Sequence, residues 1–215
     1  MNLRFPLAAL AILASAFATA PQARPVSYAD GHLLLAEHQS NLELWRYTYS
    51  PSFRWSMSVG GLNADALGET GQLQVDYLRT ARLLQRWNFH AAQANFFGWA
   101  GLGRARTAAG VETGRHAGFQ LDYETTRVYT SLVSELHEGD GWSHRFDTAS
   151  LGWAPYPHEV NRLATWIVLK GMSTSNDGEA GLKAAAAVRL FTTSWWLELG
   201  ADEDGKPLVN LMVNL

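Results

Sequence analysis

The sequence contains no cysteine, which excludes disulfide bonds, thiolate metal sites and a lipidated N-terminal cysteine. Charged residues are also scarce, at 17% against roughly 25% in ordinary soluble domains. The 17 Lys and Arg residues face 20 Asp and Glu residues, so no basic surface exists that would attract nucleic acid. Beyond residue 20, no apolar run approaches the ~18 to 20 residues that a membrane-spanning helix needs.

The first residues have the form of a secretory signal peptide. Arg4 supplies a positive charge, and residues 6–18 form an alanine-rich apolar run that is too short to cross a bilayer as an uncleaved helix. Ala16 and Ala18 fit an A-x-A cleavage site, whereas cleavage after Ala20 would place a proline next to the cut bond. We therefore predict a signal peptide over residues 1–18, an N-terminal extension over 19–30 and a single domain over 31–215.

From about residue 30 onwards, apolar and polar residues alternate with a period of two, which is the pattern of β-strands. The clearest ladder places Phe53, Trp55, Met57 and Val59 on one face and serines with Arg54 on the other. In a second ladder, Leu73, Val75 and Tyr77 alternate with Gln72, Gln74 and Asp76. Further ladders cover residues 119–124, 182–190, 195–199 and 209–215. The sequence thus predicts an all-β fold.

The connections between these ladders are expected to alternate in length. Short turns are predicted at 50–51, 79–80, 125–126, 155–157 and 192–193, and longer polar, glycine-bearing loops at 60–71, 103–118, 137–142, 173–180 and 201–206. Short periplasmic turns with longer external loops are typical of outer-membrane barrels. Counting strands in this way gives about twelve, including a weak first strand near residues 32–37, and leaves ten or eight as alternatives.

Both soluble and membrane barrels alternate, so the outward face has to be inferred from its side chains. The apolar face is bulky, and aromatic residues cluster near the predicted turns, as in an interfacial belt: Trp45, Tyr47, Tyr49, Trp55, Tyr77, Tyr123, Trp153, Tyr156 and Trp195. The polar face is then predicted to line the lumen, with Arg54, Asp76, Asp122, Glu124, Arg162, Lys170, Lys183, Arg189 and Glu198. We predict a closed antiparallel transmembrane β-barrel whose first and last strands pair, because unpaired edges are costly in lipid.

The C-terminal strand ends in alternating Val209, Leu211, Val213 and Leu215, which is similar to the terminal strand of outer-membrane proteins except that the last residue is not aromatic. This predicts insertion into outer-membrane lipid of a Gram-negative bacterium by the barrel-assembly machinery.

Several short phrases resemble a group of uncharacterised proteobacterial outer-membrane proteins. They are Tyr49-Ser50-Pro51, Gln93-Ala94-Asn95-Phe96, Asp122-Tyr123-Glu124-Thr125-Thr126-Arg127, Ala154-Pro155-Tyr156 and Leu190-Phe191. Such proteins are often encoded beside copper or heavy-metal efflux systems. The resemblance therefore implies a supporting role in metal resistance, with envelope efflux components as partners, but it transfers no functional residue.

The sequence contains few candidate catalytic or metal-ligating residues. Ser143, His144 and Asp147 could form a hydrolase set only if they met, but neighbours on a strand point to opposite faces, so we do not expect an enzyme. His137, Glu138, Asp140 and His144 are residue types that ligate zinc or copper, and they lie close together in one predicted external loop. A polar loop of this kind is more often simply solvated, so we predict no resident metal or cofactor and keep His137, Asp140 and His144 as weak candidates.

The sequence therefore favours a narrow channel or an accessory envelope protein in the outer membrane. Two alternatives stay open at this stage. One is a soluble periplasmic barrel that binds a small apolar ligand, and the other is a lipid-modifying barrel enzyme. The charges predicted for the lumen have both signs, so no preference for anions or cations can be assigned from them.

Overall fold

The computed structural model describes residues 24–65, 72–156, 162–176 and 179–215, so the predicted signal peptide and its cleavage site lie outside the described residues. No helix among those residues is long and apolar enough to cross a membrane. The chain forms twelve strands: β1 (Gly31–Gln39), β2 (Leu42–Ser52), β3 (Trp55–Asp65), β4 (Gln72–Asn88), β5 (Ala92–Thr107), β6 (Gly110–Thr125), β7 (Val128–Gly139), β8 (Trp142–Trp153), β9 (Ala164–Asn176), β10 (Glu179–Phe191), β11 (Trp195–Asp202) and β12 (Pro207–Asn214).

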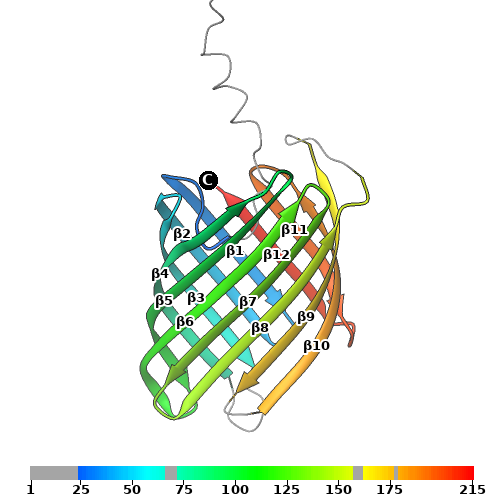
Figure 1. The fold of residues 1–215 in the computed structure, drawn as a ribbon. Coiled ribbons are helices and arrows are strands. Elements are labelled where there is room, and N and C mark those ends of the chain that lie inside the picture. The colour runs from blue at the N-terminus through cyan, green and yellow to red at the C-terminus, as the bar shows by residue number, and fades with distance from the viewer. Residues whose placement is uncertain (1–23, 66–71, 157–161, 177–178) are drawn as a thin grey trace, which may run out of the picture.

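The strands close into one antiparallel barrel in which each strand pairs with its sequence neighbours (Figure 1). β1 completes the ring by pairing with β12, with Leu35 opposite Met212 and Glu37 opposite Asn210. The predicted closed barrel of twelve strands is confirmed, and it leaves no free sheet edge. We call the rim at which β1 begins and β12 ends the terminal rim, and the opposite one the distal rim.

The connections differ from the predicted asymmetry. At the distal rim, residues 40–41, 108–109 and 140–141 are two-residue turns, as short as those at 53–54 and 126–127 on the terminal rim. The turn predicted at Arg79 and Thr80 lies inside β4, and the loop predicted over residues 103–118 is the hairpin of β5 and β6. The alternation simply continues through these polar, glycine-bearing segments, so they lengthen the strands instead of ending them.

Large apolar side chains cover the outside of the barrel wall in a continuous band, which we call the apolar band. Met57 is 61% exposed and Leu78 is 67% exposed, although both lie within regular strands. The band runs around the barrel through Leu34, Trp45, Tyr47, Met57, Val59, Leu78, Leu102, Phe119, Leu121, Leu132, Leu151, Ile167, Leu169, Val188, Leu199, Val209 and Leu211. Exposed apolar surface of this extent is typical of surfaces that bind a protein partner, a ligand or a membrane.

Toward the distal rim on β2 to β9, apolar side chains point inward and polar side chains point outward, which is the reverse of the arrangement in the apolar band. On β4, the apolar side chains of Leu73, Val75 and Tyr77 point inward and are buried, whereas Gln74 and Asp76 are exposed on the outside. The predicted orientation of this ladder, and of Tyr77 as a belt residue, is therefore wrong. The long strands of this side extend past the apolar band, and there an apolar core inside and polar groups outside are the favourable arrangement.

The outward polar positions beyond the band form a second feature, which we call the polar collar. It consists of Glu43, Asn63, Gln72, Gln74, Asp76, Arg104, Arg106, Thr113, Arg115, Glu138, Arg145 and Asp147. Charges of opposite sign pair within it, as in the contact of 2.9 Å between Arg106 Nη1 and Asp76 Oδ2.

Apolar side chains also pack inside the barrel. One cluster includes Leu44, Leu62 and Val75 on β2 to β4 and extends to Trp166 and Trp196 on β9 and β11. Near the terminal rim, the segment before β1 enters the barrel, and Val26 packs with Ala81, Leu83, Phe97 and Trp99. Ser56 Oγ donates a hydrogen bond to the carbonyl oxygen of Pro25 at 2.6 Å, and the Ser27 amide donates to Ser50 Oγ at 2.9 Å. We call residues 24–27 the terminal plug.

Candidate functional site in the barrel lumen

Six of the nine charged residues predicted for the lumen lie on the inward face of the wall. Asp122, Glu124, Lys170, Lys183, Arg189 and Glu198 all take part in contacts inside the barrel. The other three do not line it. Arg54 is exposed in the turn between β2 and β3, Asp76 belongs to the polar collar, and Arg162 is exposed in the connection before β9. Their positions follow from turns and from the exchanged faces, which local alternation does not reveal.

Glu198 is the centre of one buried charge cluster. It is 0% exposed and accepts from Arg189 Nη2 at 2.7 Å, from Asn210 Nδ2 at 2.9 Å and from Lys170 Nζ. The strand register brings these side chains together, because Arg189, Glu198 and Asn210 occupy paired positions on the neighbouring strands β10, β11 and β12. The Arg189 guanidinium also lies 4.8 Å from the centre of the Trp196 ring, a cation–π contact.

A second buried cluster lies across the lumen and was not predicted. Arg79 Nη1 donates to Glu135 Oε2 at 3.2 Å, and Glu135 Oε1 lies 2.8 Å from His137 Nε2. Arg79 stacks over the Trp99 ring at 4.7 Å. Arg79 had been assigned to a turn, although the inward alternation of Tyr77, Arg79 and Ala81 was present in the sequence and could have identified it.

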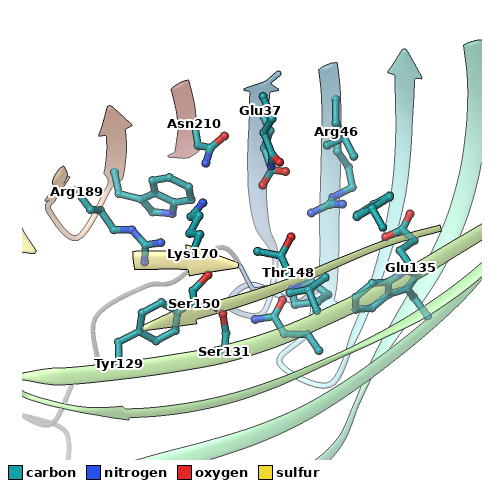
Figure 2. A pocket seen from close by; sticks show the side chains of 18 of the residues that line it. Glu37, Arg46, Tyr129, Ser131, Glu135, Thr148, Ser150, Lys170, Arg189 and Asn210 are labelled. Carbon is teal, nitrogen blue, oxygen red and sulfur yellow. Dashed lines mark hydrogen bonds between the residues drawn. The ribbon is translucent and has the colours of Figure 1, made fainter. Parts of the chain in front are cut away.

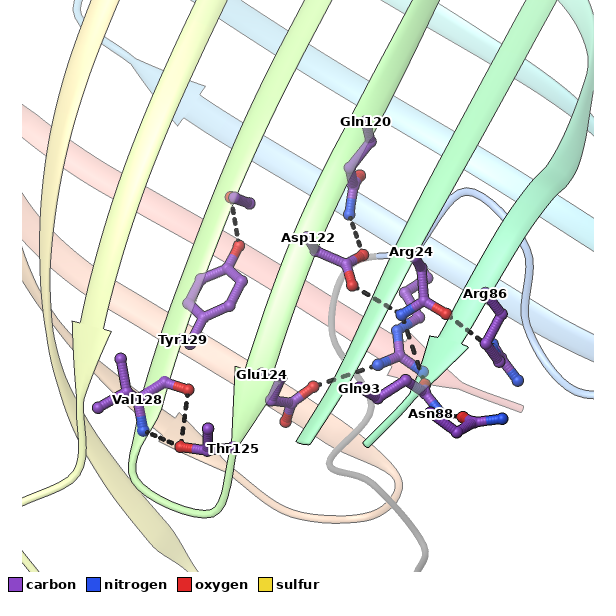
Figure 3. A network of polar contacts seen from close by, with 12 residues as sticks. Arg24, Arg86, Asn88, Gln93, Gln120, Asp122, Glu124, Thr125, Val128 and Tyr129 are labelled. Carbon is purple, nitrogen blue, oxygen red and sulfur yellow. Dashed lines mark hydrogen bonds and ion pairs between the residues drawn. The ribbon is translucent and has the colours of Figure 1, made fainter. Parts of the chain in front are cut away.

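A third network surrounds Asp122 near the terminal rim (Figure 3). Asp122 accepts from Asn95 Nδ2 at 2.7 Å and from Gln120 Nε2 at 3.2 Å, and Arg86 Nε donates to Asn95 Oδ1 at 2.7 Å. The terminal plug joins this network, because Arg24 Nη2 pairs with Glu124 Oε2 at 3.1 Å. The plug is therefore held by a buried ion pair as well as by apolar packing.

A cavity of about 100 Å³ remains between these clusters, inside the barrel (Figure 2). Figure 2 shows Glu37, Arg46, Lys170 and Arg189 extending into a common space from different parts of the wall. By this measure a water occupies at least roughly 10–15 Å³, so the cavity holds several waters or a small ion, but no large solute. Glu37 and Arg46 were not among the predicted lumen residues.

Lys183 occupies a different place, at the distal rim. Its Nζ lies 3.3 Å from Asp202 Oδ2 and 2.9 Å from Asp204 Oδ2, which joins β10 to the turn between β11 and β12. These two ion pairs lie at the edge of the lumen, and Lys183 does not line the cavity.

The predicted metal candidates do not form a common site. His137 and His144 are opposite each other on β7 and β8, inside the wall and each 1% exposed, so they are not in a solvated loop. Asp140 lies in the turn, and Glu138 pairs with Arg115 in the polar collar. In the part of the chain that the structure describes, no group of three or more His, Cys, Asp or Glu residues could hold a metal ion.

The serine of the candidate hydrolase set is likewise separated from its base. Ser143 and His144 are consecutive in β8, and their Cα partners Glu138 and His137 have opposite orientations in the wall. Asp147 belongs to the outward set with Ser143 and contacts Arg145 at 2.9 Å.

Comparison with known proteins supplies no relative on which to base a function. No protein-family model matches the chain, and no curated protein is significantly similar to it.

Proposed function

We propose that this chain is an integral outer-membrane protein whose lumen forms a narrow channel that the terminal plug constricts. The observation that carries the membrane assignment is the apolar band, which surrounds a barrel without free sheet edges. Each strand of the wall pairs with a neighbour on both sides, and the side chains that face out in the apolar band are the ones hydrocarbon favours. In water the same side chains would remain exposed at a cost of roughly 25 cal/mol per Å² of apolar surface.

Aromatic side chains at the terminal rim support this assignment. Trp55, Tyr123, Trp153 and Tyr156 are each 40–46% exposed on the outside near the ends of their strands. Trp and Tyr prefer the boundary between lipid and water, because their rings are apolar and their polar atoms reach water. The terminal rim then lies at one boundary of the membrane, and the polar collar stands in water beyond the other boundary.

Fractionation together with heat-shift electrophoresis tests the membrane assignment. The folded protein should sediment with outer membranes, should be extracted only by detergent, and should migrate differently before and after boiling. Recovery in the soluble periplasm without a change in migration would instead favour a soluble barrel that binds an apolar ligand among its inward leucines.

The charged cavity supports the channel role. Its walls carry Arg and Lys as well as Glu, and Pro25 of the terminal plug is one of its lining residues. Pores of this kind pass small ions when binding in the lumen is favourable but weak. We expect small, infrequent conductance steps from the purified protein in planar bilayers, and larger ones from a variant in which the plug is released.

An accessory envelope role is favoured by one specific observation, the apolar cluster that packs inside the wall on β1 to β4 and on β9 to β12. If neither the intact protein nor a plug-released variant passes current, the barrel serves as a membrane anchor for its outer surface. The link with metal resistance stays a prediction from the resemblance, and it is tested by comparing growth of a deletion strain and its parent in copper.

A further inference from the structure

The cavity wall carries buried N–H groups without a hydrogen-bond partner in the described chain. They are Nε of Arg46, Nε and Nη2 of Arg79, and Nε1 of Trp99, in residues that are 8%, 3% and 7% exposed. Among the described lining residues, one buried acceptor also lacks a hydrogen-bond partner, namely Oδ1 of Asn210. Buried donors without acceptors are unfavourable. The imbalance points to a ligand that accepts hydrogen bonds and donates none, which is the property of an inorganic anion.

The charges around the cavity show the same imbalance. Arg79 pairs with Glu135, while Lys170 and Arg189 share Glu198. The cationic side chains are Arg46, Arg79, Lys170 and Arg189, and the carboxylates are Glu37, Glu135 and Glu198, so 4 − 3 leaves one positive charge when all are ionised. The neighbouring network at the terminal rim is balanced, with Arg24 and Arg86 against Asp122 and Glu124. An uncompensated charge inside a barrel is costly, and one monovalent anion would neutralise it.

Arg46 differs from the other cationic lining residues of the described chain, which all take part in ion pairs. In the described chain it forms no salt bridge with a carboxylate, and it is near enough to Arg79 for the two guanidinium groups to repel each other. Glu37 interacts electrostatically with both Lys170 and Arg46, but it makes no salt bridge with either. An anion beside the Arg46 and Arg79 guanidinium groups would relieve this repulsion.

We propose that the lumen cavity is a binding site for one small monovalent inorganic anion, such as chloride or bromide, with Arg46 and Arg79 as its main ligands. The cavity size suits such an ion together with a few waters. The site deepens the proposed channel by giving it anion selectivity. Binding of the anion requires only the folded barrel, so it can be tested separately from ion conduction.

Crystals of the mature protein grown in bromide test the site directly. A bromide peak in anomalous difference maps, within hydrogen-bond distance of both Arg46 and Arg79, is expected. A cavity that contains only water at high bromide overturns the proposal. Because this measurement uses the unaltered protein, it does not depend on whether any variant folds.

Thermal unfolding in detergent gives a second readout. At constant ionic strength, replacing gluconate by bromide should raise the Tm in a saturable manner, because a ligand that binds the folded state stabilises it. Arg46→Met should abolish the bromide-dependent rise, and Glu37→Gln should lower the half-saturating bromide concentration several-fold. Arg106→Met, in the polar collar, is the matched control and should behave as the unaltered protein. An equal rise in all four proteins would overturn the site.

Reversal potentials in planar bilayers then separate this proposal from the channel. A bound bromide in a barrel that passes no current leaves the site intact and refutes the channel. Current without anion preference, together with a cavity free of bromide, leaves the channel intact and refutes the site.

Discussion

Placing an arginine in the apolar band at Leu211 is the most direct test of what surrounds this barrel. Leu211 faces outward on β12, is 38% exposed, and lies opposite Leu197 on β11 and Ala36 on β1. It is three residues from one end of the strand and four from the other. With a rise of ~3.3 Å per residue and a tilt of ~45°, these separations correspond to about 7 and 9 Å along the membrane normal.

Leu211 is thus near the middle of the wall at this position, where it would lie deep in hydrocarbon. Arginine at such a depth costs about 2–4 kcal/mol in a transmembrane barrel, against about 0–1 kcal/mol near the interface. Leu211→Arg should therefore lower the folding equilibrium constant roughly 30- to 700-fold. The matched control is Asn63→Arg, which faces outward in the polar collar beside Glu43 and should be close to neutral.

The assay is reversible urea unfolding of the protein in lipid vesicles, followed by the fluorescence of its nine tryptophans. The free energies of unfolding of both variants are compared with that of the unaltered protein. A soluble barrel would expose Leu211 to water, where a surface substitution changes stability by about 0.5 kcal/mol or less. Equal stabilities for the two variants would refute a hydrocarbon environment for the apolar band.

Three further predictions concern the lumen and the wall. Glu198→Gln removes the carboxylate that Lys170 and Arg189 share and should lower the free energy of unfolding by about 3–5 kcal/mol in the same urea assay. A loss below about 1 kcal/mol would show that water already compensates the two cations. Val26→Asp puts a charge into the packing of the terminal plug and should increase single-channel conductance in planar bilayers, and unchanged conductance would show that the plug does not constrict the lumen. Gly200→Ala would bring its Cβ 2.2 Å from the Ala186 carbonyl oxygen and should lower stability by about 1–3 kcal/mol, whereas Gly171→Ala meets open space and should be neutral.

Much of the wall was predictable, because alternation is a property of the extended backbone itself. Residues 55–59 of the ladder predicted over 53–59 begin β3, with Met57 and Val59 facing outward as predicted, whereas residues 53–54 form the preceding turn. Closure followed from the pairing requirement of the backbone. Asp122, Glu124 and Glu198 could be assigned to the polar face in the same way.

The charge clusters themselves could not be predicted. Arg79 and Glu135 are separated by 56 residues, and they meet because the curvature of the ring brings together inward side chains of β4 and β7, which have only β5 and β6 between them. Arg24 reaches Glu124 over 100 residues. Which charges become partners depends on strand register and barrel curvature, and neither is encoded in local alternation.

The sequence by itself determined that this chain is a ribbon with an apolar and a polar side, long enough for twelve strands, because side chains on a strand must alternate. Only the tertiary structure decided which side faces out at each height. Leu73 and Val75 turn inward where β4 extends past the apolar band, while Leu78 turns outward within it. The physical reason is that alternation defines two faces, whereas the surroundings of the closed wall at each level determine which of them is buried.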